Sequence, residues 1–286
     1  MELDLNEDEN NEGNIDKMLD TFRSSFWHDE HQWFVQYDWS LDESKVCFYT
    51  LPYGFDTFCL ESCILSKSTS SLNSYRSSYD QVRHLICTVD FFKYSAPFNI
   101  QFCNIEKLSI RFPINEQFWF IIPTCSRLIS LDILSSHPDE YCKRQLQALL
   151  DRAPHLSSLN IRDYWFSWPS EMIAFNKNIA SIFQLNVLLS DVSYDNEQCI
   201  ALCDAPLGTQ CEVLSIRVTN RTCILDLING MNKLRVLNVQ CQDDQSIKNT
   251  VSDVDELINW LSEQQPSLYA ISEIIRWGKT IHVWIR

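Results

Sequence analysis

Glycine is scarce in this chain. Five glycines, at positions 13, 54, 208, 230 and 278, stand among 286 residues, and no two are closer than 22 positions. A phosphate-binding P-loop, a dinucleotide-binding G-x-G-x-x-G turn, a kinase glycine loop and a G-x-S-x-G nucleophile elbow each need closely spaced glycines. The spacing therefore excludes all four motifs.

Basic residues are also few. The chain has 23 Lys and Arg against 38 Asp and Glu, which gives a formal net charge of -15 and a pI near 4.7. Nucleic acids and anionic membranes are bound first through Lys and Arg, so neither is expected as the main partner. Eight of the acids lie in the first twenty residues, which predicts an acidic, disordered leader over residues 1–20.

Long hydrophobic runs are missing. One of the most apolar runs, Phe118–Ile122, is far shorter than the roughly 18 residues of a membrane span. The acidic start has neither the basic nor the apolar segment of a signal peptide. Twelve cysteines are scattered through apolar segments, where free thiols behave as small hydrophobic groups. We therefore expect a reducing compartment, the cytoplasm or the nucleus, and no membrane partner.

The cysteines and histidines lack the spacings of common metal sites. No C-x2-C pair occurs, and two pairs have the wider C-x3-C spacing: Cys59 with Cys63, and Cys199 with Cys203. His28 and His31 do not form an H-E-x-x-H motif, and no third ligand is evident beside them. The sequence therefore predicts no metal, no cofactor and no catalytic residue.

A six-residue pattern recurs along the chain. Each copy has a leucine followed two positions later by an apolar residue, as in L-S-S-L-N-I around Leu159. Successive copies are 23, 23, 28, 26, 29 and 23 residues apart, within the range of roughly 20 to 29 residues of leucine-rich repeats. The alternation predicts a short strand in each copy. We refer to the central leucines as the repeat leucines: Leu85, Leu108, Leu131, Leu159, Leu185, Leu214 and Leu237.

Helical spacing follows several of these strands. Cys142, Leu146, Leu149 and Ala153 form an apolar stripe that ends before a proline. Similar patterns cover 195–205 and 253–265. The predicted fold is α/β, a leucine-rich-repeat solenoid with a curved parallel sheet and helices on the convex side. An ordinary doubly wound α/β sheet is the alternative.

The stretch from Val82 to Cys241 resembles the repeat region of F-box/leucine-rich-repeat proteins, which are substrate receptors of ubiquitin ligases. The match is closest from Leu149 to Ile161, where a helix, a proline and L-x-x-L-x-I follow one another. The resemblance implies a solenoid that recognises a substrate protein and a ubiquitin-ligase core as a partner.

Two features depart from that family. No F-box pattern is found, because Leu51-Pro52 leads into an aromatic segment without an acidic helix start. The position that usually holds an Asn or Cys ladder is degenerate, with Pro113, Ser136, Tyr164, Ser190, Thr219 and Gln242.

The segments before and after the predicted repeats differ from them in amino-acid composition. Residues 21–65 are rich in aromatics and predict a β-rich N-terminal cap, with a hairpin formed by Gln32–Trp39 and Val46–Leu51. An aromatic recognition surface is the alternative use of this segment. We expect a Ser-rich linker or loop over 66–80, repeats over 81–245, and a closing helix and strand over 246–286.

Residues that alternate with the inward aliphatic positions should line the concave face of the sheet. The candidate protein-binding residues are Lys107, Ser109, Arg111, Asp132, Asn160, Arg162, Asn186, Ser215, Arg217, Asn238 and Gln240. Arg111, Arg162 and Arg217 share one repeat position and predict a positive stripe for an acidic or phosphorylated segment. Plain solvation, or pairing with acids such as Asp132, is the alternative.

The predicted function is a non-enzymatic protein-interaction scaffold, with substrate recognition for a ubiquitin ligase as the role that the family resemblance implies. The alternatives are a structural or regulatory leucine-rich-repeat protein without a ubiquitin role, and an enzyme on an ordinary α/β fold. A closed sheet with converging titratable groups would favour the enzyme.

Overall fold

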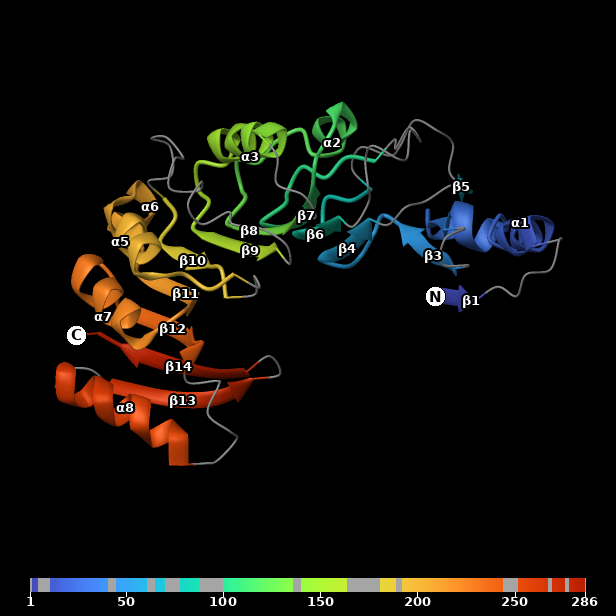
Figure 1. The fold of residues 1–286 in the computed structure, drawn as a ribbon. Helices are drawn as coiled ribbons and strands as arrows, with labels where there is room; N and C mark the ends of the chain where they lie inside the picture. The colour runs from blue at the N-terminus through green and yellow to red at the C-terminus, as the bar shows by residue number, and fades with distance from the viewer. Residues whose placement is uncertain are drawn as a thin grey trace. The chain divides into compact units, whose positions relative to one another are not determined.

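The computed structural model describes residues 2–4, 11–40, 45–60, 65–69, 78–87, 100–135, 140–163, 181–188, 192–243, 252–266, 269–275 and 278–285. The chain has a mixed α/β fold with a large, mostly parallel sheet (Figure 1). It divides into two compact units, residues 1–128 and 129–286, and each is described separately. The division falls inside the segment 81–245 predicted as repeats.

The N-terminal unit begins with a small antiparallel sheet and continues with parallel strands. Its elements are β1 (Glu2–Asp4), α1 (Asn11–Thr21), the π-helical turn η1 (Phe26–Glu30), β2 (Phe34–Ser40), β3 (Lys45–Leu51), β4 (Thr57–Leu60), β5 (Leu65–Ser68), β6 (His84–Cys87), β7 (Lys107–Phe112) and α2 (Glu116–Ile121). The small sheet has the order β1-β3-β2-β5, and β4, β6 and β7 pair in parallel. The predicted hairpin is confirmed as β2 and β3.

The acidic leader is not disordered over its second half, which corrects the prediction for residues 1–20. Helix α1 begins at Asn11, and its Ile15 and Leu19 are buried against Val35 and Tyr37 of the small sheet. The helix was not predicted because acidic residues predominate in this segment. An amphipathic helix can nevertheless pack through one apolar stripe, here the side with Ile15 and Leu19.

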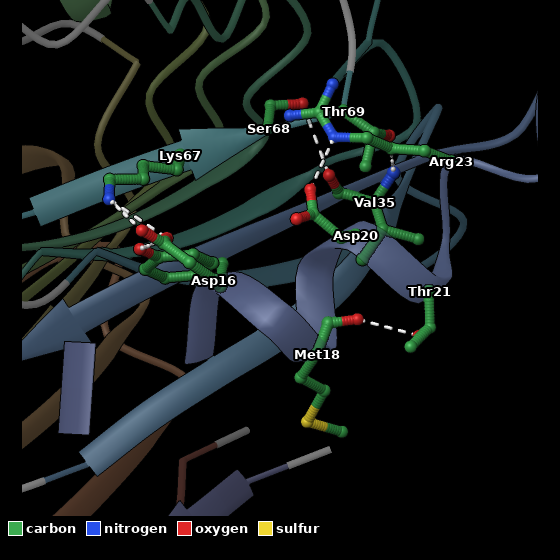
Figure 2. A network of polar contacts seen from close by, with 10 residues as sticks. Asp16, Met18, Asp20, Thr21, Arg23, Val35, Lys67, Ser68 and Thr69 are labelled. Atoms are coloured by element: carbon green, nitrogen blue, oxygen red, sulfur yellow. Dashed lines mark hydrogen bonds and ion pairs between the residues drawn. The ribbon is translucent and has the colours of Figure 1, made fainter. Parts of the chain in front are cut away.

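An ion pair also holds α1 to the small sheet. Figure 2 shows the side chain of Lys67 on β5 directed at the carboxylate of Asp16 on α1. The Lys67 Nζ lies 2.7 Å from an Asp16 carboxylate oxygen. The Tyr37 hydroxyl donates to the same carboxylate at 3.0 Å. These bonds to Lys67 and Tyr37 lower the pKa of Asp16, and burial together with Asp16 raises the pKa of Tyr37 to about 12.

The predicted cap and linker boundaries also need correction. Strand β4 pairs in parallel with β6, and Phe58 stands opposite the repeat leucine Leu85, 27 positions later. Phe58 and Leu60 are buried, so this strand alternates like the repeats although its marker is phenylalanine. Strand β5 includes the first residues of the predicted Ser-rich linker, because serine is compatible with a strand of a small sheet. Residues 70–77 of that linker lie outside the described residues.

The C-terminal unit alternates strands and helices. Its elements are β8 (Ser130–Ser135), α3 (Glu140–Arg152), β9 (Ser158–Asp163), β10 (Gln184–Asn186), α5 (Asn196–Asp204), α6 (Pro206–Gln210), β11 (Val213–Val218), α7 (Arg221–Gly230), β12 (Val236–Cys241), α8 (Ser252–Gln264), β13 (Tyr269–Ile275) and β14 (Gly278–Trp284). The three predicted helices are confirmed as α3, α5 and α8. Asp195 caps α5 in a reciprocal capping box with Gln198.

The strands of this unit form one sheet in the order β8-β9-β10-β11-β12-β14-β13. Strands β8 to β12 are parallel, and β14 pairs antiparallel with both β12 and β13. Figure 1 shows α3, α5, α6 and α7 along one face of the sheet, and the described part of the unit places no helix over the opposite face. The sequence predicted β14 but not β13.

The repeat leucines of the C-terminal unit stand side by side. Leu159 lies opposite both Leu131 and Leu185, and Leu214 lies opposite both Leu185 and Leu237. In the N-terminal unit, Leu85 lies opposite Leu108. All seven are at most 3% exposed, so each row forms a continuous dry layer.

A repeated backbone pattern precedes the strands. The carbonyl of the residue before one strand accepts hydrogen bonds from two successive N–H groups at the start of the next. Ser157 and Ser158 donate to Ile129, Phe183 and Gln184 to Ser157, Glu212 and Val213 to Phe183, and Arg235 and Val236 to Glu212, at 2.8 to 3.1 Å. The N-terminal unit has the same bonds at Asp56 and Arg83. The accepting residues share no side-chain type, so the pattern has no signature in the sequence.

Candidate functional site

The candidate site is the sheet face of the C-terminal unit that no described helix covers, which we term the open face. Because side chains alternate along a strand, the residues beside each buried leucine point to this face. In β9, for example, Leu159 and Ile161 are buried, whereas Ser158 and Asn160 are half-buried and Arg162 is exposed. The strand register thus determines which side chains become neighbours.

One line of polar side chains crosses six adjacent strands of the open face. We term it the polar row, and its members are Asp132, Asn160, Asn186, Ser215, Asn238 and His282. Neighbouring strands lie about 4.8 Å apart, so these side chains repeat at that interval. Three of the six are asparagines, whose amides can each donate and accept hydrogen bonds.

Hydrogen bonds hold four of the six side chains of the polar row in place. The side-chain amide of Asn238 donates to the Ser215 hydroxyl at 2.9 Å, and its carbonyl oxygen lies 2.7 Å from Nδ1 of His282. Because the amide nitrogen is directed at Ser215, Nδ1 of His282 is the donor to the carbonyl oxygen. The Asn186 carbonyl oxygen accepts from the backbone N–H of Leu188 at 3.1 Å.

Two of the predicted arginines lie two residues beyond the polar row. Arg162 forms an ion pair with Asp132 at 2.8 Å, and its side chain remains 45% exposed. Arg217 donates twice to the side-chain oxygen of Gln240, at 3.2 and 3.1 Å. Arg162 therefore pairs with Asp132, as the alternative interpretation of the arginines expects. Arg217 also has a partner on the open face, the side chain of Gln240.

Gln240 joins this pair to the last strand. It is 2% exposed, and its amide nitrogen donates to the Thr280 hydroxyl at 3.0 Å. Thr280 is also buried. The hydrogen-bonded series Arg217–Gln240–Thr280 thus links β11, β12 and β14 across the open face.

The remaining predicted residues lie on β7 in the N-terminal unit. Lys107 and Arg111 are exposed and Ser109 is buried. The structure therefore brings together eight of the eleven predicted residues on the open face of the C-terminal unit: Asp132, Asn160, Arg162, Asn186, Ser215, Arg217, Asn238 and Gln240.

Sequence reasoning did not include His282 and Thr280 in the site. Both lie on β14, which runs antiparallel to β12, so no repeat motif surrounds them. The available signal was the T-I-H-V-W alternation at 280–284, with Ile281 and Val283 buried and the intervening residues on the other face.

A second polar cluster lies in the N-terminal unit. Asp38 accepts hydrogen bonds from Tyr49 at 2.5 Å, Ser66 at 2.6 Å and Gln36 at 3.1 Å. Burial raises the pKa of Asp38, although these three donors oppose the rise. Burial and the neighbouring carboxylate raise the pKa of Tyr49 well above its usual value. The donors come from β2, β3 and β5, so the cluster fastens these strands together.

The thiols of Cys199, Cys203 and Cys211 are not activated. Burial, followed by the neighbouring Cys223, raises the pKa of Cys199 far above its usual value. Burial also raises the pKa values of Cys203 and Cys211 to about 11. Among the residues that the structure describes, no group of three or more His, Cys, Asp and Glu side chains is placed to hold a metal ion.

No protein-family model matches the chain, and a search of curated proteins gives no significant match. Within the described ranges, no helix combines the length and apolar character needed to span a bilayer.

Replacing Thr280 by valine tests the Arg217–Gln240–Thr280 link. Valine has nearly the same shape but leaves the buried amide of Gln240 without its acceptor, so the free energy of unfolding in urea should fall by about 1 to 2 kcal/mol. The matched control is Thr124→Val, because the Thr124 hydroxyl donates to Ser126 at an exposed site. That control should change stability by less than about 0.5 kcal/mol. Equal stabilities of the two variants would show that the Gln240–Thr280 bond does not form.

Proposed function

We propose that the chain is a non-enzymatic scaffold that binds an extended segment of a partner protein on the open face of a leucine-rich-repeat solenoid. The polar row is the observation that supports this proposal most strongly. The in-register repeat leucines and the recurring carbonyl pattern support the solenoid, because both repeat from one strand to the next as a stack of similar units requires.

The chemistry of the polar row suits a peptide main chain. A main chain presents alternating N–H donors and C=O acceptors, and an asparagine side chain presents the same two groups. Asn160, Asn186 and Asn238 are half-buried. The side chain of Asn186 is held by the backbone N–H of Leu188, and that of Asn238 by the Ser215 hydroxyl. Side chains that are already restrained lose less entropy when a ligand binds.

The arginines add a preference for acidic groups. Arg162 is almost half exposed beside Asp132, so a carboxylate or phosphate of the partner could share its guanidinium through a second pair of N–H groups. Arg217 and, in the N-terminal unit, Arg111 occupy the equivalent strand position. We therefore propose a partner segment with an acidic or phosphorylated residue.

A panel of random extended peptides, probed with the full chain, tests this function. Replacing Asn160, Asn186 and Asn238 together by alanine should weaken every bound peptide by at least about tenfold, because several main-chain hydrogen bonds are lost at about 0.5 to 1.5 kcal/mol each. Replacing Arg111, Arg162 and Arg217 together by serine should weaken only acidic peptides. This variant should also melt at a lower temperature, because Asp132 and the buried Gln240 each lose a contact, so binding is measured well below that temperature.

The control for both variants is Asn229→Ala, an exposed asparagine on α7. Peptides that bind the asparagine triple variant as tightly as they bind the Asn229→Ala protein would refute the open face as the binding surface. Equal loss of acidic and neutral peptides in the arginine variant would refute the acidic preference.

Substrate recognition for a ubiquitin ligase is the specific role that the resemblance to F-box/leucine-rich-repeat proteins suggests. In that role, ligase core subunits should co-purify with the tagged chain and remain bound to the asparagine triple variant, because core and substrate would use different surfaces. Absence of core subunits from purifications that retain a partner would favour a structural or regulatory scaffold without a ubiquitin role.

A further inference from the structure

Aromatic side chains gather on the surface of the N-terminal unit just before β2. Phe26 and Trp27 belong to η1, and His31 and Trp33 follow it. We term these four residues the aromatic patch. Phe26 is 48% exposed and Trp33 is 45% exposed. A cap for the core would bury such rings, so their exposure needs another explanation.

The rings of the aromatic patch are held in a defined arrangement. His31 stacks on Trp33 with ring centroids 4.7 Å apart and planes at 21°, and Phe26 meets His31 edge-on at 4.6 Å. Trp27 contacts Trp33 at 6.0 Å and packs against the buried core of the small sheet. The patch is therefore anchored on one side and open on the other.

The backbone between these rings is constrained. The N–H of Trp33 donates to the carbonyl of Trp27 at 2.9 Å, which closes the turn. Gln32 has a φ of 53°, a left-handed conformation that a residue with a side chain adopts at some cost. This turn brings the imidazole of His31 against the indole of Trp33.

The turn that carries Phe26 and Trp27 also carries two acidic residues. Asp29 and Glu30 belong to the same turn as Phe26 and Trp27, are exposed, and form no ion pair with any described residue. An indole face attracts cations through its quadrupole, and nearby carboxylates add to that attraction. The combination suits a cationic side chain.

We propose that the aromatic patch binds an arginine side chain in a basic segment of a partner protein. The guanidinium would stack on the accessible indole surface of Trp33, much as the planar ring of His31 does, while Asp29 or Glu30 accepts its N–H groups. Arginine is favoured over lysine because its planar cation is weakly hydrated and stacks on aromatic rings. This site does not depend on the function proposed for the open face.

Fluorescence anisotropy with labelled twelve-residue peptides tests the proposal on the full chain. Alternating Gly-Arg should bind more tightly than alternating Gly-Lys, and alternating Gly-Gln should not saturate. Trp33→Ala should weaken Gly-Arg binding by about threefold to fivefold, the effect of losing one exposed cation–π contact. Phe55→Ala, which removes a 69% exposed ring elsewhere in the same unit, should leave binding unchanged.

Net charge is separated from the specific site by comparing variants of equal charge. If Trp33→Ala and Phe55→Ala bind Gly-Arg equally, the acidic chain attracts the peptide without using the patch, and the proposal is wrong. If Trp33→Ala lowers the melting temperature, the double variant Asp29→Asn with Glu30→Gln decides. It should bind Gly-Arg more weakly than the equally charged variant Asp204→Asn with Glu263→Gln, whose exposed acids lie in the other unit, and equal affinity of these two variants would overturn the proposal.

Discussion

The lateral contact between repeat leucines is the interaction on which the rest of the structure depends. Leu159 lies directly opposite its counterparts in the strands on both sides, and so does Leu214. Strands about 4.8 Å apart bring such side chains into contact. Burying one leucine side chain stabilises a fold by about 1.5 to 3 kcal/mol, but only where neighbours complete the dry layer. Each strand is therefore stabilised by its neighbours. Strand β10 has only three residues and is stabilised by β9 and β11, which pair with it on both sides.

The same contact creates the candidate site. Side chains alternate with a period of two, so a slip of one residue would send a leucine to the open face and an asparagine to the core. Because Leu185 lies opposite Leu159 and Leu214, Asn186 lies opposite Asn160 and Ser215. The packing of the repeat leucines on the buried face of the sheet thus determines which side chains are neighbours in the polar row.

The strands around the repeat leucines and helices α3, α5 and α8 could be predicted, because leucine spacing indicates where the strands lie and proline positions indicate where helices end. Strand β4 was missed because Phe58 replaces leucine in an otherwise equivalent position. The contact between Arg162 and Asp132 depends on the register of β8 and β9. The sequence alone is compatible with more than one partner for Arg162. His282 belongs to the polar row through β14, an antiparallel strand that lacks the repeat pattern, so the sequence did not indicate its place. The carbonyl pattern could not be predicted either, because it uses backbone atoms of unlike residues such as Ile129 and Glu212.

Nuclear Overhauser contacts between leucine methyl groups measure the central packing directly. In protein labelled at leucine methyls, a continuous series should connect Leu131, Leu159, Leu185, Leu214 and Leu237 in that order, each residue contacting only its immediate neighbours in the series. A break in the series, or contacts that join these methyls to leucines outside it in place of their expected neighbours, would contradict the in-register layer and remove the basis of the open face.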